Sequence, residues 1–158
     1  MTAAPLHHRP VPPAVHELLE RSRSTLEAAC RTSDVSERYL EAHLGALRAA
    51  AALVAARTVP SPRSRPRNVW QVLPALAPDL GEWAAFFAGT SSRRAVLDRG
   101  GWLPAREADD LLRQAEMFLE IVQDRLGIPQ TLPLPDSITP LVPSRSAIRA
   151  ASIPTGAG

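Results

Sequence analysis

The chain has 158 residues, a formal net charge of +2 and a single cysteine, Cys30. This length fits one domain that buries its own core, and a lone cysteine excludes an internal disulfide and a thiolate cage around a metal. A charge so close to zero does not by itself indicate a nucleic-acid-binding protein. Alanine and leucine dominate the apolar residues, and β-branched residues form no alternating runs, which favours an all-α protein.

All 18 cationic side chains are arginines. Arginine favours bidentate contacts to phosphate or carboxylate groups, but the complete absence of lysine is more typical of a compositional bias. The first thirty residues lack a basic end followed by an apolar run, and the longest nearly uncharged stretch, residues 49–56, is too short to span a bilayer. The sequence therefore predicts a soluble, cytoplasmic protein with no membrane partner.

Residues 1–11 contain two prolines and two adjacent histidines without helical periodicity, so we expect a disordered lead-in. Pro12 and Pro13 suit the first turn of a helix, where a missing amide donor costs little. Apolar positions then recur at helical spacing from Val15 until about Thr32. This pattern predicts a first helix over residues 12–32.

Asp34 and Glu37 stand three residues apart before an apolar run, which is the spacing of a capping box. They predict a second helix over residues 34–58. Its alanine-rich second half has few polar side chains for water to solvate, and its small side chains let other helices approach closely. We therefore interpret it as the central helix of a bundle. The short joint before it forces an antiparallel pair with the first helix.

The third region begins with a proline and arginine loop over residues 59–67. Asn68 predicts the N-cap of a short helix that Pro74 kinks or ends, because proline removes an amide donor. A further helix is predicted from Pro78, and we expect it to stop near Gly89.

Ser91 or Ser92 is then expected to cap a short turn through Leu97, closed by Gly100 and Gly101. The aromatic residues of this half of the chain fall on apolar stripes, which predicts core positions rather than a base-stacking platform. They are Trp70, Trp83, Phe86, Phe87 and Phe118.

The closing helix is predicted over residues 107–126, with acidic residues in its first turns, Arg125 near its end and Gly127 as its stop. Prolines interrupt all periodicity beyond Ile128, so residues 128–158 are expected to form a largely disordered tail, with residues 128–134 packing back on the bundle. The prediction is thus an all-α, antiparallel bundle of four to five helices over residues 12–127.

Several segments resemble the HEPN superfamily. They are HELLERSRSTLEAA, ERYLEAHLGALRAAAALVAAR, NVWQVLPALAPDLGEWAAFFAG and ADDLLRQAEMFLEIVQDRLG, which together span roughly residues 14–127. The nearest likeness is to an uncharacterised bacterial, actinobacterial-type branch. The resemblance implies an antiparallel bundle that is often a homodimer. Many HEPN proteins are metal-independent endoribonucleases with an arginine, four to six residues and a histidine, whereas others bind nucleotides or protein partners without catalysis.

Arg38 and His43 match this spacing, so the resemblance implies that His43 transfers a proton and Arg38 stabilises charge on a phosphate. Active members usually carry the motif later in the bundle and with a polar residue after the arginine, where this chain has Tyr39. Five residues along a helix also turn the direction by about 140°, so the two side chains diverge unless Arg38 folds across or a second subunit completes the site. The structural alternative is a surface arginine in ordinary ion pairs and a partly buried histidine.

A second candidate site is a set of arginines that could bind a nucleic-acid backbone, with a solvated connector as the alternative. The set comprises Arg57, Arg63, Arg65, Arg67, Arg93 and Arg94. His7, His8 and His16 lack carboxylates or thiolates at ligand spacing, so neither a metal site nor a cofactor is predicted. Two hypotheses follow: a HEPN protein that engages RNA or nucleotides, and a non-catalytic helical module that binds another protein.

Overall fold

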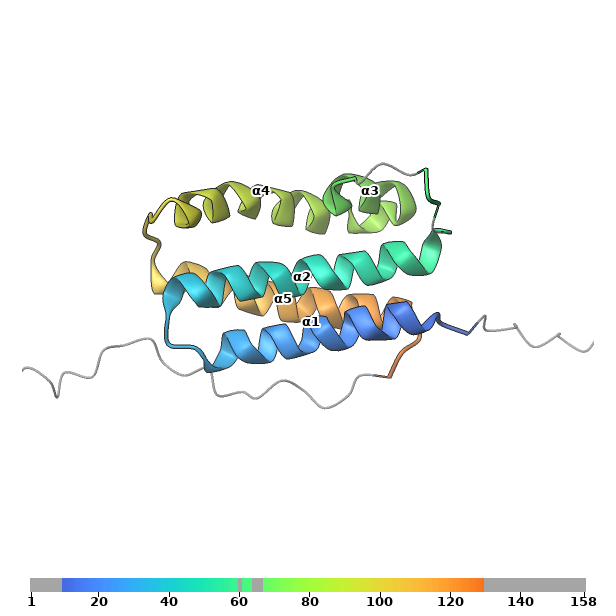
Figure 1. Ribbon diagram of the computed structural model, residues 1–158, viewed down its shortest axis with the longest axis horizontal. Helices are drawn as coiled ribbons and strands as arrows, with labels where there is room; N and C mark the ends of the chain where they lie inside the picture. Colours follow the sequence, from blue (N-terminus) through green and yellow to red (C-terminus); the bar gives the residue numbers. More distant parts are fainter. Residues whose placement is uncertain (1–9, 60, 64–66, 130–158) are drawn as a thin grey trace, which may run out of the picture.

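The structure, a computed structural model, describes residues 10–59, 61–63 and 67–129. These residues form five α-helices and one 3₁₀ helix, without strands (Figure 1). In chain order the elements are α1 (Pro13–Arg31), α2 (Val35–Arg57), α3 (Val69–Leu76), η1 (Pro78–Leu80), α4 (Gly81–Asp98) and α5 (Ala105–Arg125). The predicted all-α bundle is confirmed.

The helices form two packed groups joined by α2. Helices α1, α2 and α5 pack against one another, while α3 and α4 lie across the opposite side of α2 from α1 (Figure 1). Helix α2 packs against each of the other four α-helices, as its alanine-rich sequence predicts. Ala42, Ala46, Ala49 and Ala50 are fully buried along it, because their small side chains let neighbouring backbones come close.

The turn between α1 and α2 confirms the predicted cap in part. Asp34 accepts a hydrogen bond from the backbone N–H of Glu37 at 2.7 Å. The return bond of a capping box does not form, because the Glu37 carboxylate accepts instead from the Thr32 hydroxyl at 2.5 Å. The Asp34 N–H donates to that same hydroxyl at 3.2 Å, so Thr32 replaces Glu37 as its partner.

The predicted break at Gly89 is wrong, because α4 continues through it to Asp98. A glycine inside a helix costs only about 1 kcal/mol relative to alanine, which packing elsewhere in α4 can offset. Ser92 does not begin a new turn, because its hydroxyl donates to the Gly89 carbonyl at 2.8 Å within the same helix. The predicted stop after Leu97 is confirmed by Gly100, whose φ is 77°.

Helix α3 continues for two residues beyond Pro74 and ends at Leu76, where the Ala77 N–H donates to the Leu73 carbonyl at 2.8 Å. Asn68 caps this helix as predicted, accepting from the Trp70 N–H at 3.0 Å. Gly127 ends α5 as predicted, with a φ of 65°.

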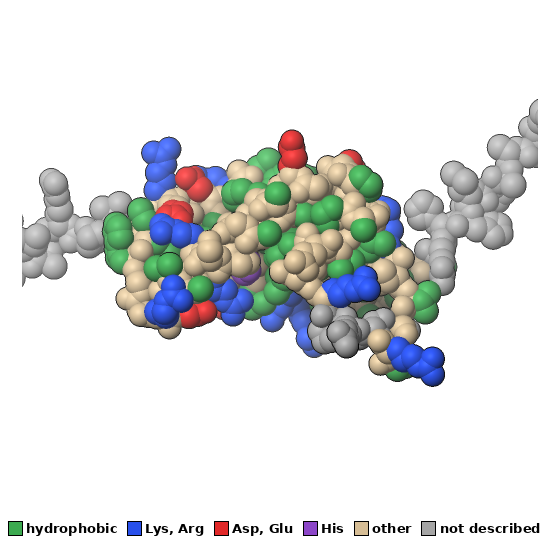
Figure 2. Space-filling view, turned by 90° about the horizontal axis from the view of Figure 1, so that it is seen from above, with side chains coloured by type: hydrophobic (Ala, Val, Ile, Leu, Met, Phe, Trp, Pro, Cys, Tyr) green, Lys and Arg blue, Asp and Glu red, His purple; other side chains and the backbone are tan. Residues whose placement is uncertain are grey.

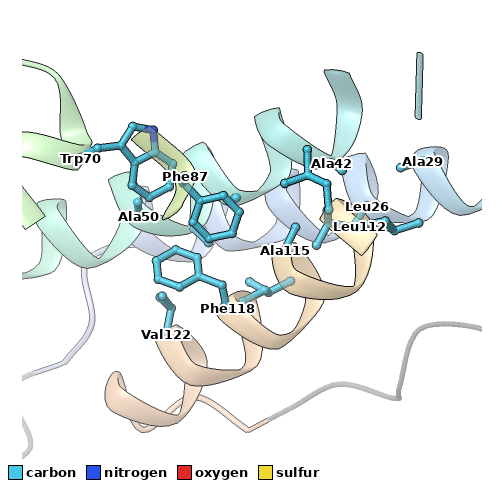
Figure 3. Packing of buried hydrophobic residues seen from close by; sticks show 14 of the residues in the cluster. Leu26, Ala29, Ala42, Ala50, Trp70, Phe87, Leu112, Ala115, Phe118 and Val122 are labelled. Carbon is cyan, nitrogen blue, oxygen red and sulfur yellow. The ribbon is translucent and has the colours of Figure 1, made fainter. Parts of the chain in front are cut away.

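An aromatic cluster joins the two groups of helices (Figure 3). Phe87 of α4 stacks on Trp70 of α3 with centroids 5.0 Å apart, and both rings approach Phe118 of α5, at 5.2 and 6.0 Å. Trp83 is half-buried beside them. The prediction that Phe86 is also a core residue is wrong: its side chain is 44% exposed.

Residues 1–9 and 130–158 lie outside the described part of the chain, and with them most of both predicted tails. Val11 and Ile128, at the two ends of that part, are partly buried against the core. No helix in the described ranges is long and apolar enough to cross a lipid bilayer.

Candidate functional site

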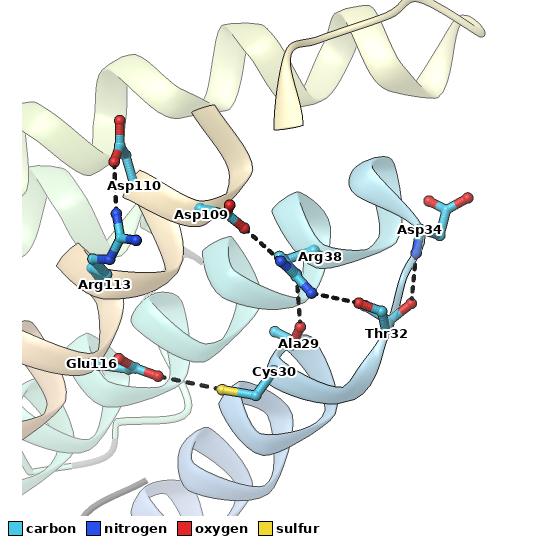
Figure 4. A network of polar contacts seen from close by, with 9 residues as sticks. All are labelled: Ala29, Cys30, Thr32, Asp34, Arg38, Asp109, Asp110, Arg113 and Glu116. Atoms are coloured by element: carbon cyan, nitrogen blue, oxygen red, sulfur yellow. Dashed lines mark hydrogen bonds and ion pairs between the residues drawn. The ribbon is translucent and has the colours of Figure 1, made fainter. Parts of the chain in front are cut away.

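Arg38 is fully buried where α1, α2 and α5 meet, and it is a junction residue rather than an exposed cation (Figure 4). Its guanidinium donates to Asp109 Oδ1 of α5 at 2.5 Å and to the carbonyl of Thr32 at 2.7 Å. Its Nε donates to the carbonyl of Ala29 at 3.1 Å. The two carbonyls belong to the last turn and the C-cap of α1, where backbone acceptors lack partners within their own helix.

His43 is only 3% exposed and points toward α4. Its Nδ1 lies 2.8 Å from the hydroxyl of Thr90, and that hydroxyl donates to the carbonyl of Phe87 at 2.8 Å. Because the hydroxyl proton is used in that bond, the Thr90 oxygen accepts, which assigns the His43 proton to Nδ1. Burial, assisted by the charge of Arg94, lowers the pKa of His43, so the ring is neutral at neutral pH.

The structure does not bring Arg38 and His43 together. Arg38 contacts α1 and α5, whereas His43 contacts α4 on the other side of α2. This is the divergence that their spacing on a continuous helix predicts.

The main hollow near these residues is a pocket of about 500 Å³ between α4, α5 and the start of α2. Its apolar lining includes Tyr39, Phe86 and Leu111, and Gly89 of α4 also lines it. We call it the α4 pocket. A smaller hollow lined by Glu82, Trp83 and Gln114 lies on the other side of Phe86, which lines both.

A bidentate ion pair forms one side of the α4 pocket. The Nε and Nη2 atoms of Arg93 donate to the two carboxylate oxygens of Glu107 at 2.6 and 2.5 Å. This hydrogen bonding lowers the pKa of Glu107. Arg106 and Asp110 add a second charge of each sign to the lining, so the pocket carries no strong net charge.

The described members of the predicted arginine set fall into two groups at opposite ends of the bundle (Figure 1). Arg57, Arg63 and Arg67 are exposed near the end of α2, and Arg57 donates to the Leu76 carbonyl at 3.3 Å. Arg65 lies outside the described residues. Arg93 and Arg94 belong to the last turns of α4, and Arg93 lines the α4 pocket together with Tyr39 of α2. At 1.5 Å per residue, Tyr39 lies about 27 Å from Arg57 along α2.

Three features of this region were not predicted from the sequence: the Asp109 and Thr90 partners, and the α4 pocket. In the sequence, Asp109 is one of several acidic residues in the first turns of the closing helix. The sequence feature that indicates a buried partner for Asp109 is its position at the edge of an apolar stripe, next to the buried Ala108. Among the described residues, no group of three or more histidine, cysteine or acidic side chains is placed to hold a metal ion.

Comparison with known proteins identifies the family. A family model described as SAV_6107-like HEPN matches residues 29–123, from the end of α1 to near the end of α5, which is more than half of the chain. Neither a curated protein nor a solved structure gives a significant match. The expected HEPN resemblance is therefore confirmed, and the chain belongs to the SAV_6107-like family of HEPN domains.

Proposed function

We propose that this HEPN domain is a non-catalytic module that binds another protein through the α4 pocket. The observation that carries the proposal is the burial of both residues with ribonuclease spacing, Arg38 and His43, in separate structural networks. A catalytic arginine must reach the phosphate, and a catalytic histidine must lie within hydrogen-bond reach of the proton that it moves.

Arg38 already uses its guanidinium on one carboxylate and two helix-end carbonyls. A phosphate at this point would have to displace Asp109 and open the contact between α1 and α5. His43 donates from Nδ1 to Thr90, and its neutral ring is covered by the packing of α4 on α2. Both arrangements are typical of side chains that stabilise a fold.

The α4 pocket is the accessible concave surface that suits a partner. Apolar walls beside a mixed-charge ion pair match the apolar centre and polar rim of protein interfaces. The balanced charges make it poorly suited to a polyanion, whose binding depends on excess positive charge. Phe86, one of the residues that line the pocket, is exposed, and aromatic residues are enriched where interfaces carry most binding energy.

Two experiments test this proposal. Purified protein incubated with RNA in EDTA should give no cleavage above a His43→Ala control; cleavage by the wild type that His43→Ala abolishes, with helical circular dichroism retained, would contradict it. A photoreactive phenylalanine analogue at Phe86 should crosslink to protein in the native host, whereas the same analogue at Val59 should not. If position 86 gives no protein adduct, the pocket does not bind a protein partner.

A second candidate function is single-stranded RNA binding by the loop between α2 and α3. Residues 57–67 contain four arginines and no acidic residue, and the three that are described are exposed. Replacing Arg57, Arg63, Arg65 and Arg67 by glutamine should weaken RNA binding and flatten its salt dependence in fluorescence anisotropy. Equal affinity in the replaced variant would rule this loop out.

A further inference from the structure

We propose that the groove between α4 and α5 binds residues 140–143 of this same chain, which have the sequence Pro-Leu-Val-Pro. This inference rests on the proposed function, because it names a segment that fills the α4 pocket and that a protein partner must displace. Residues 140–143 lie outside the described part of the chain. Three observations support the proposal: the shape of the groove, the spacing of the prolines and the length of the chain that leads to them.

The groove contains two neighbouring hollows. One is the α4 pocket, and the other is the smaller hollow beyond Phe86, which we call the Trp83 hollow; Phe86 lines both. Near one end of the groove, Arg93 of α4 pairs with Glu107 of α5. Near the other end, the ring centroid of Trp83 lies 5.6 Å from that of Phe118. The two helices therefore run antiparallel along both hollows.

The two hollows are spaced like two prolines that are separated by two residues. The α4 residues that line the Trp83 hollow, 82–86, are centred about 8 Å along the helix from those that line the α4 pocket, 86–93. On α5, Gln114 of the Trp83 hollow is likewise about 8 Å from the middle of residues 106–111 of the pocket. A polyproline II helix places residues i and i+3 on one face about 9 Å apart, so one proline fits each hollow.

The lining of the groove suits proline rings. Trp83 lines one hollow, Tyr39 lines the other and Phe86 lines both. Proline-rich segments bind in aromatic-lined grooves of this kind, because their fixed backbone loses little entropy on binding. Residues 83–92 of α4 include no charged side chain. Figure 2, which views the molecule from the α4 side, shows mainly apolar and uncharged groups over the middle of this face.

The chain beyond the described bundle contains one segment with the required spacing. Among the prolines after residue 129, only Pro140 and Pro143 stand three positions apart. Leu141 and Val142 between them are apolar, and residues 137–144 carry no charge. An uncharged, apolar segment matches a groove whose own lining charges balance.

The connection from α5 to this segment is long enough to reach the groove. The N–H of Ile128 donates to the Gln123 carbonyl at 3.0 Å, which places residue 128 beside the end of α5. Gln114 of the Trp83 hollow lies about 14 Å back along α5 from Gln123. The twelve residues from Ile128 to Pro140 span about 17–21 Å as a flexible chain and at most about 37 Å as polyproline II. Pro140 then enters the Trp83 hollow, which is the nearer one, and Pro143 enters the α4 pocket.

Crosslinking within the purified 158-residue chain tests this contact. A photoreactive phenylalanine analogue at Phe86 should join the tryptic peptide of residues 68–93 to that of residues 126–145 in the same molecule, as read by mass spectrometry. Replacing both Pro140 and Pro143 by alanine should lower the crosslinked fraction at least about fivefold. Replacing both Pro133 and Pro135 by alanine is the matched control and should leave the fraction unchanged.

Peptide binding gives an independent measurement with Phe86 in place. A short tether holds the segment at an effective concentration of about 1 mM, so it competes strongly with a free peptide. A labelled peptide of residues 137–146 should therefore bind the Pro140→Ala, Pro143→Ala variant at least about tenfold more tightly than the wild type in fluorescence anisotropy. Adding Phe86→Ala to this variant should weaken peptide binding, whereas adding Val59→Ala, an exposed position outside both hollows, should not.

Several results would overturn the inference. They are equal peptide affinity in the wild type and the double variant, a crosslink that survives both alanine changes, and a crosslink that joins two molecules instead of one. The proposed function is tested separately by crosslinking in the native host. If position 86 crosslinks to a host protein but never to residues 126–145, only this inference fails. A crosslink to residues 126–145 without any host adduct supports the inference and refutes the protein partner.

Discussion

Replacing Arg38 by methionine tests whether this residue stabilises the fold rather than acting on a substrate. Methionine keeps most of the side-chain volume and removes the charge. The change deletes the ion pair to Asp109 and the hydrogen bonds to the Ala29 and Thr32 carbonyls. Removing one partner of a buried ion pair costs about 3–5 kcal/mol.

The expected loss lies near the lower end of that range. Asp109 is 24% exposed, so water can solvate its carboxylate once Arg38 is gone. We therefore expect the free energy of unfolding to fall by about 3 kcal/mol, a large share of the roughly 5–15 kcal/mol of a typical domain. For a chain of this length the corresponding decrease in Tm is about 6–12 °C.

Urea unfolding followed by circular dichroism at 222 nm measures this change. Arg113→Met is the matched control, because Arg113 pairs with Asp110 on the same helix at 57% exposure, and its loss should cost less than about 0.5 kcal/mol. Adding Asp109→Asn to Arg38→Met should recover part of the stability by removing the unpaired carboxylate. A loss below about 1 kcal/mol for Arg38→Met would refute the assignment of Arg38 as a structural junction.

Three further predictions concern buried groups. Burial and the charge of Arg94 lower the pKa of His43 in the folded chain. As the pH falls, His43 is therefore protonated in the unfolded chain at a higher pH than in the folded chain. Stability should therefore be full above about pH 6.5 and fall below it, and pH-dependent urea titrations of His43→Gln should show a weaker fall. Gly45→Ala should lower the free energy of unfolding by about 1–3 kcal/mol, because a Cβ there would lie 2.7 Å from Leu26 Cγ; unchanged thermal melting would contradict this. Burial, with Glu116 nearby, raises the pKa of Cys30 to about 12, so a thiol reagent should label it at the unfolding rate, and fast labelling of the native protein would be the opposing result.

The helices of the first half and the closing helix could be predicted because their information is local. The helix caps and stops formed by Asp34, Asn68 and Gly127 involve backbone groups only a few residues away. The alanine run of α2 is consistent only with a buried helix in the centre of a bundle. The prediction that a helix stops near Gly89 is wrong because a glycine ends a helix only when tertiary packing does not stabilise the helix on both sides of it.

The candidate site could be predicted only in part, for a different reason. The spacing of Arg38 and His43 on one helix does indicate that they diverge. The position and bonding of the Arg38 side chain depend on Asp109, 71 residues further along the chain, and those of His43 depend on Thr90, 47 residues further along. Periodicity carries no signal for such distant partners, and the α4 pocket likewise arises only when α4 and α5 are placed beside α2.

The three tryptophans occupy very different surroundings, and this gives the protein a built-in optical probe. Trp70 is 4% exposed and Trp83 is half-buried within the aromatic cluster, whereas Trp102, in the connection between α4 and α5, is 79% exposed. Iodide should therefore quench mainly the red-shifted emission of Trp102, leaving the blue-shifted light of Trp70 and Trp83. A Trp102→Phe variant would then emit chiefly from the seam where α3 and α4 meet the rest of the bundle, so separation of these helices could be followed without an added label.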